Sequence, residues 1–273
     1  LRSGVGPDNE ISKHGIDHLV DLPGVGKNLQ DHIDYITVHK YNSMKLIGFS
    51  LKTIFLKYPY EVLKYLITKT GLFTSTIAEA GAFLKTRDDL EAPNIQFHYA
   101  PAMVIDHGRK LLWGTGMSCH SCLLRPKSRG EVTLESADPF ADPLIDPKFL
   151  SHPDDMKDMV DGYKIMMKVL GTEPFSKYIS DHTMRPIDIN DDSDIEQAMR
   201  EEADTVYHPV GTCKMGDDEM SVVDSRLKVH NMKGLRVVDA SIMPTLVGGN
   251  TNAPTIMIGE KASDMILQDW NMH

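Results

Sequence analysis

The stretch that decides the fold lies near the C-terminal end, at 235–241 (LRVVDAS) and 248–255 (GGNTNAPT). The apolar run predicts a buried strand over Leu235–Asp239, and apolar residues at helical spacing predict a helix from Pro254 through Asp269. A strand, a Gly/Asn loop and a helix start expose backbone N–H groups to an electron-rich ligand atom or an anion. The alternative is a structural loop, in which Asn250 and Asn252 cap the helix end.

A second irregular stretch precedes it, at 207–216 (YHPVGTCKMG). It is rich in Gly and Pro and fits neither the helical nor the strand period. His208 stands before a rigid proline in this loop, and histidine titrates near neutrality, so His208 is a candidate catalytic group. A lone histidine is more often structural, and the segment alone leaves both readings open.

The middle of the chain has more regular patterns. We predict strands of a half-exposed antiparallel sheet, and helices beside it. The expected strands are 94–99, 118–124 and 131–134, and the expected helices are 51–70 (with Pro59 as a boundary or kink and Gly71 as the stop), 154–170 and 194–204 (capped by Ser193). Strands followed by helices indicate an α+β fold.

Two motifs that suggest a ligand do not match their patterns. The loop at 24–29 (GVGKNL) has Leu29 where a dinucleotide fingerprint needs its third glycine, and Asp21 stands where a P-loop needs its first. We expect a structural turn or a backbone-rich loop close to a bulky ligand. Cys119 and Cys122 lack a second ligand pair, so we expect packing and no metal site.

Composition narrows the function classes further. The net charge of −10 and the absence of a basic run disfavour nucleic-acid binding and a membrane-surface role. No apolar window approaches the ~18 residues of a membrane helix. Leu1 is not an initiator methionine and no leader pattern follows it, so we expect that upstream sequence was removed or not included. Three cysteines do not determine the compartment.

Four ordered blocks together resemble the C-terminal half of the glucose-methanol-choline (GMC) oxidoreductases, which are FAD-dependent alcohol oxidases and dehydrogenases. The blocks are 3–7, 21–32 (DLPGVGKNLQDH), 208–216 with 238–241, and 249–262 (GNTNAPTIMIGEKA). The last block is most similar to the insect-type glucose dehydrogenase branch, which suggests a secreted parent protein.

The resemblance implies a role for particular residues. His208 matches the active-site base, which takes the hydroxyl proton of an alcohol or sugar while hydride passes to the flavin, and Asn250 matches the second active-site position. An amide is not a base near neutral pH, so the base is His208. The positions that match FAD contacts are Asp239, Ala240, Asn252, Ala253 and Pro254, with Asn28 as a weaker candidate.

The same resemblance implies a domain layout. Residues 1–43 and 205–273 are expected to belong to the FAD-binding domain, and residues 44–204 to a GMC-type substrate domain, an antiparallel sheet with helices. The glycine-rich cradle for the FAD pyrophosphate is not found in this sequence, so we expect weak FAD binding and marginal stability of the isolated chain. The electron acceptor, a quinone or oxygen, is not determined. A truncated pseudoenzyme or binding module is the alternative, and a metal-binding α+β protein that uses His98, His107, His120 and the cysteines is a third.

Overall fold

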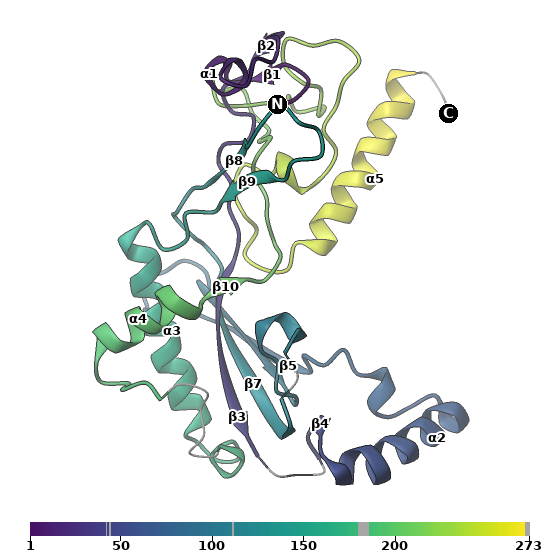
Figure 1. Ribbon diagram of the computed structural model, residues 1–273, viewed down its shortest axis with the longest axis vertical. Helices are drawn as coiled ribbons and strands as arrows, with labels where there is room; N and C mark the ends of the chain where they lie inside the picture. Colours follow the sequence, from purple (N-terminus) through teal and green to yellow (C-terminus); the bar gives the residue numbers. More distant parts are fainter. Residues whose placement is uncertain (42, 44, 111, 180–185, 271–273) are drawn as a thin grey trace. The chain divides into compact units, whose positions relative to one another are not determined.

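The computed structural model describes residues 1–41, 43, 45–110, 112–179 and 186–270 (Figure 1). The chain forms two compact units. The first unit comprises Leu1–Ile33, Leu124–Asp155 and Thr205–His273, and the second unit comprises Asp34–Leu123 and Met156–Asp204. The boundaries differ from the expected 44–204, because β3 (Ile33–Lys40) pairs with β7 (Gly114–Leu123) over its length and because the segment after β7 returns to the first unit.

An antiparallel sheet forms the centre of the second unit. Its strand order is β10-β3-β7-β6-β5, and β4 pairs with β7 off this path. The further strands are β4 (Gly48–Phe49), β5 (Ala80–Leu84), β6 (Ile95–Ala100) and β10 (Asp204–Thr205). The strands predicted at 94–99 and 118–124 are therefore confirmed as β6 and as the second half of β7.

The expectation that this sheet is half-exposed was wrong, because both faces of β7 are covered. On one face, α3 (Pro153–Leu170) lies beside the strands (Figure 1), and Gly162 approaches so closely that a Cβ there would lie 3.0 Å from Ile95 Cδ1 and Ser121 Oγ. On the other face, the Ser118 hydroxyl donates to Ala102 O (2.8 Å) and accepts from Val104 N (2.7 Å). Period-2 alternation is lost where both faces are buried.

The helices follow their predicted patterns with small shifts. The predicted 51–70 helix is a π-helical turn, η1 (Thr53–Lys57), which continues into α2 (Tyr58–Thr68) and ends at Lys69 in the left-handed conformation. The α3 helix is confirmed. In α4 (Asp192–Glu202) the cap is Asp191, which accepts from Ser193 N at 2.9 Å, and not Ser193 as predicted. The short 3-10 helices are η2 (Leu72–Thr74), η3 (Asp106–Gly108) and η4 (Ser176–Tyr178).

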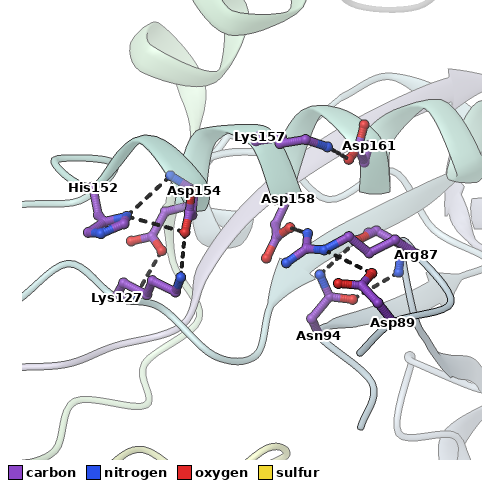
Figure 2. A network of polar contacts seen from close by, with 11 residues as sticks. Arg87, Asp89, Asn94, Lys127, His152, Asp154, Lys157, Asp158 and Asp161 are labelled. Atoms are coloured by element: carbon purple, nitrogen blue, oxygen red, sulfur yellow. Dashed lines mark hydrogen bonds and ion pairs between the residues drawn. The ribbon is translucent and has the colours of Figure 1, made fainter. Parts of the chain in front are cut away.

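Polar contacts join α3 to neighbouring segments of the chain (Figure 2). In the second unit, the Arg87 guanidinium bonds to Asp158 of the helix and also lies 3.4 Å from an Asp89 carboxylate oxygen. In the first unit, Asp154 in the first turn of the helix pairs with Lys127. Both contacts bring a cation to a carboxylate, and the acidic first turn also complements the positive end of the helix dipole.

The first unit has little regular structure. It holds β1 (Val5–Gly6) parallel to β2 (Val20–Asp21), the antiparallel pair β8 (Glu131–Leu134) and β9 (Pro143–Asp146), the helices α1 (Asp8–Ser12) and α5 (Asn252–Asp269), and η5 (Ala240–Ile242). The strand predicted at 131–134 exists as β8, but it pairs with β9 and not with the central sheet. The apolar core of the first unit includes Val210, Val223, Ile242, Leu246 and Ile258.

The predicted buried strand at 235–239 was wrong. Within the described residues this segment makes one isolated bridge, Lys228↔Arg236, and Leu235 is 43% exposed. Its backbone instead bonds to the preceding loop, where Val229 N donates to Leu235 O (3.0 Å) and Val237 N donates to Leu227 O (3.2 Å). A strand needs a paired neighbour to exist, and apolar composition does not supply one.

Candidate functional site

The site around His208 is built from three segments of the first unit that are distant in sequence. A short antiparallel bridge joins Gln30 to Val210, with Gln30 N to Val210 O at 3.0 Å and Val210 N to Gln30 O at 2.9 Å. The Gln30 side chain extends this link to the third segment. Its Nε2 donates to Pro244 O at 3.1 Å, and its Oε1 accepts from Leu246 N at 3.1 Å. The residues that follow Gln30 therefore lie against the residues that precede Val210.

Asp31 holds the backbone of the His208 loop. One carboxylate oxygen accepts from His208 N at 2.9 Å, and the other accepts from the Thr205 hydroxyl. That hydroxyl oxygen also accepts from Tyr207 N at 2.8 Å, and Tyr207 has a left-handed backbone (φ 64°), which few non-glycine residues adopt. Burial raises the pKa of Asp31, and its hydrogen bonds to Thr205 and His208 act in the opposite direction. The turn that presents His208 is thus fixed by one buried carboxylate.

His32 contacts the His208 ring directly. The two Nδ1 atoms are 2.9 Å apart, and the ring planes are nearly perpendicular, at 87°, with centroids 5.0 Å apart. His32 is fully buried, and its Nε2 lies 3.2 Å from Leu124 O and 3.1 Å from Val247 O. The histidine at 208 therefore has a buried histidine as its ring partner.

The electrostatic surroundings keep His208 neutral near neutral pH. Its half-buried position lowers the pKa of the imidazole, and the nearby Asp31 carboxylate partly opposes this shift. A histidine whose pKa lies below its ordinary value of ~6.5 is unprotonated at pH 7. A neutral, half-exposed imidazole on a fixed loop can accept a proton from a bound substrate.

The predicted second active-site residue lies in the third segment. Asn250 is exposed, three residues after Val247, whose carbonyl contacts His32. The α5 helix begins at Asn252, and the preceding Thr251 makes no side-chain capping bond. Asn252 and Ala253 are exposed at this helix start, and Pro254 is half-buried. The N–H groups of the first helical turn lack intrahelical partners and favour negative charge.

The remaining predicted FAD contacts are the neighbours Asp239 and Ala240, and Asn28, which has a structural role. Asp239 is exposed and caps η5, accepting from Ser241 N at 2.7 Å, and Ala240 beside it is half-buried. Asn28 has a left-handed backbone (φ 61°), and its Nδ2 donates to Gly211 O and Pro244 O, each at 3.2 Å. The Asn28 amide therefore joins the three segments of the site, a role the sequence reading did not include.

The donor set fits the cofactor that the sequence implies. Beside the open helix start lies Arg125, whose guanidinium is so close to Gly248 that a Cβ there would lie 2.7 Å from Nη2. Backbone N–H groups, an amide side chain and a guanidinium all suit an electron-rich ring system that gains negative charge on reduction. Arg125, the start of α5 and Asp239 all belong to the first unit.

Other groups considered as ligands lie in the second unit, where the His98 and His120 rings are 6.0 Å apart and His120 Nδ1 lies 2.6 Å from Asp34 Oδ2. Burial raises the pKa of the Cys119 thiol to about 12, so it is not a reactive thiolate, and Cys122 is also buried. Across the part of the chain that the structure describes, no group of three or more His, Cys, Asp or Glu side chains is arranged to hold a metal ion. In the same residues no helix has the length and apolar character of a membrane span.

Comparison with known proteins places this site in a family context. Residues 126–259 match the protein family described as GMC oxidoreductase. The chain is 45% identical over its full length to an alcohol dehydrogenase [acceptor] of Pseudomonas putida and 38% identical over 97% of its length to an oxygen-dependent choline dehydrogenase of Klebsiella pneumoniae. It covers 49% and 48% of these proteins, so it spans about half the length of the curated relatives it matches.

Solved structures agree with the sequence matches. The formate oxidase of Aspergillus oryzae, described with its FAD modification, superposes on the whole chain with a TM-score of 0.89 at 27% identity, and 52% of its own chain is covered. The predicted α+β fold and the resemblance to GMC oxidoreductases are thereby confirmed, and FAD is the cofactor of this group of proteins. The relatives named here do not identify the insect-type glucose dehydrogenase branch.

The sequence reading missed two residues of the candidate site, Asp31 and His32. The signal for them was present, because both close the 21–32 block that resembles the family's flavin-proximal loop. Their contacts with His208 join residues 177 and 176 positions apart, which no local pattern reports.

Proposed function

We propose that this chain is the C-terminal half of an FAD-dependent oxidoreductase that acts on CH–OH donors, with His208 as the base. The observation that carries the proposal is the neutral, half-exposed His208 imidazole on a loop held by Asp31. The identity to alcohol and choline dehydrogenases supports the substrate class, an alcohol or a sugar. The likeness of 249–255 to the insect-type glucose dehydrogenases supports a sugar within that class.

In this proposal His208 and Asn250 act on the substrate, and other residues of the first unit hold FAD. His208 removes the hydroxyl proton of the substrate, and the Asn250 amide holds the substrate oxygen. When bound, FAD supplies the acceptor for the hydride that leaves the carbon. The residues that would hold FAD are Asp239, Ala240, Asn252, Ala253 and Pro254, with Asn28 fixing the loops beside them. The second unit, Asp34–Leu123 with Met156–Asp204, would then provide the substrate domain, and the first unit the flavin side.

Flavin binding and reduction test the proposal. The purified chain is incubated with FAD, separated by gel filtration and scanned for visible flavin absorbance, then given a panel of alcohols and sugars with an artificial electron acceptor. We expect flavin reduction that His208→Ala lowers by about 10²–10⁴-fold, the usual contribution of a general base. His230→Ala is the matched control, because His230 lies in the same unit and its side chain, among the described residues, contacts a backbone carbonyl, Gly216 O at 3.0 Å.

Two results would contradict the proposal. Retained flavin that no alcohol reduces would favour a binding module. Reduction that is unchanged in His208→Ala would place the base elsewhere. If the chain alone retains no flavin, the same pair of variants is compared in a longer polypeptide, because the relatives are about twice the length of this chain.

A further inference from the structure

We propose that Gln30 is a positioning residue of the candidate site. Its side-chain amide holds the loop that leads to Asn250 and to the start of α5 against the loop that carries His208. The catalytic meaning of this contact rests on the proposed function, whereas the contact itself rests on the geometry of the first unit.

The Gln30 amide has one orientation that satisfies its surroundings. Its Nε2 lies 3.1 Å from Pro244 O and 3.4 Å from Asn28 O, and its Oε1 lies 3.1 Å from Leu246 N. A carbonyl oxygen only accepts and a backbone N–H only donates, so a flipped amide would lose all three hydrogen bonds. Because Gln30 is only 2% exposed, a lost partner would leave a buried polar group unsatisfied.

The backbone of the same residue holds the second loop. Gln30 N donates to Val210 O at 3.0 Å, and Val210 N donates to Gln30 O at 2.9 Å. Val210 follows His208 by two positions, and Leu246 precedes Asn250 by four. One residue therefore bonds through its main chain to the loop of the proposed base, and through its side chain to the loop of the second active-site position.

The backbone of Gly211 leaves the space in which the Gln30 amide makes these contacts. A Cβ at Gly211 would lie 3.1 Å from Gln30 Nε2 and 2.4 Å from Asn28 O. The amide thus packs directly against the His208 loop as well as bonding to the 244–246 loop. Two features, a buried amide and a glycine without room for a side chain, keep the two loops in close contact at one point.

The relative position of the two loops matters for the proposed chemistry. His208 takes the proton of a substrate hydroxyl and Asn250 holds its oxygen, so both side chains must reach the same group. A displacement of about 1 Å in such an arrangement can lower a rate by about 10²-fold. Gln30 itself is buried, and we expect it to act on kcat through these two residues.

Hydrogen exchange at single backbone amides, followed by NMR in the full chain without FAD, tests the contact. In Gln30→Met the side chain keeps a similar length but offers no acceptor to Leu246 N. We expect the Leu246 amide to exchange at least about tenfold faster. Val210 N should stay protected, because its acceptor is the backbone oxygen of residue 30, and Val222 N, which bonds to Lys214 O at 2.9 Å, should not change.

Activity gives a second readout in FAD-loaded protein that oxidises an alcohol. Gln30→Met should lower kcat by about 10²-fold with little change in KM. In Gln30→Glu the carboxylate has no hydrogen for Pro244 O at pH 8, whereas a protonated carboxyl at pH 5.5 can donate one. The kcat of Gln30→Glu relative to the wild type should therefore be higher at pH 5.5. Gln197→Met is the control, because Gln197 is an exposed glutamine of the second unit.

Unchanged exchange of the Leu246 amide in Gln30→Met overturns the proposal, and so does an unchanged kcat. Faster exchange spread equally over Leu246, Val210 and Val222 also overturns it, because that pattern indicates a loss of stability of the whole unit. If Gln30→Met does not fold, Gln30→Glu decides: the Leu246 amide should be less protected at pH 8 than at pH 5.5, and equal protection overturns the proposal. If the wild type oxidises no alcohol, the proposed function fails, and the exchange results still test the contact.

Discussion

Replacement of Asp31 should release the loop that carries His208. In Asp31→Ala two hydrogen bonds to a carboxylate are lost, from His208 N at 2.9 Å and from the Thr205 hydroxyl. Hydrogen bonds to a charged group contribute ~1.5–3 kcal/mol each. Asp31 is only 8% exposed and burial raises its pKa, so its desolvation offsets part of this gain. We expect a loss of about 2–4 kcal/mol in the free energy of unfolding at pH 7.

Asp31→Asn removes the negative charge of the side chain but keeps an oxygen that accepts hydrogen bonds. The amide keeps an oxygen for His208 N, so the loss should be about 1 kcal/mol. Because Asp31 raises the pKa of His208, the pKa of His208 should fall further in both variants. In Asp31→Asn we expect the pKa of His208 to fall while the loop that carries His208 keeps its backbone conformation.

The measurement is urea unfolding followed by circular dichroism, with the shift in midpoint multiplied by the slope m. Asp217→Ala is the control, because Asp217 is an exposed carboxylate in the same unit. Equal stability of Asp31→Ala and Asp31→Asn, within about 0.5 kcal/mol, would refute the reasoning. It would mean that the carboxylate does not hold the loop.

Three further substitutions test other parts of the structure. Gly211→Ala should destabilise by about 1–3 kcal/mol, because Gly211 has φ +96° and a Cβ would lie 2.4 Å from a backbone oxygen; thermal unfolding checks this beside Gly234→Ala, where φ is +78° but no atom lies within 4 Å. Asp155 is 2% exposed and accepts three hydrogen bonds from the 127–128 turn. Asp155→Ala should therefore cost about 3–5 kcal/mol in urea unfolding, while the more exposed Asp154→Ala should cost under about 1 kcal/mol; similar values for both would contradict the account. Burial lowers the pKa of His39, so the folded state binds fewer protons than the unfolded one, and stability should fall as the pH drops below the ordinary value of ~6.5. Unfolding at pH 7.5 and 5.5 should show a smaller difference in His39→Asn than in the wild type, and an unchanged difference would argue against the burial effect.

Several features of the fold could be predicted because they depend on local patterns. The apolar spacing of 154–170 predicted the long helix α3, because apolar residues that repeat every 3.6 positions form one buried face of a helix. The central strands β6 and β7 were also predicted from a local pattern, the alternation of polar and apolar residues. The half-exposure of their sheet was not, because coverage of a second face by the Ala102–Val104 segment is a contact between distant residues.

The sequence by itself determined the chemical identity of the candidate base and the resemblance of the chain to a known family. His208 stands in a Gly/Pro loop, and its block, together with the block at 249–262, was enough to indicate the GMC oxidoreductases. Composition could not decide whether 235–239 forms a strand, because a strand exists only through its neighbours.

Only the tertiary structure decided what surrounds His208. Asp31 and His32 reach it across more than 170 residues, and hydrogen bonding and burial at that meeting point set its backbone and its pKa. A sequence names the groups that can carry a proton. The distances between them, which fix where the proton resides, arise when separate segments of the chain pack together.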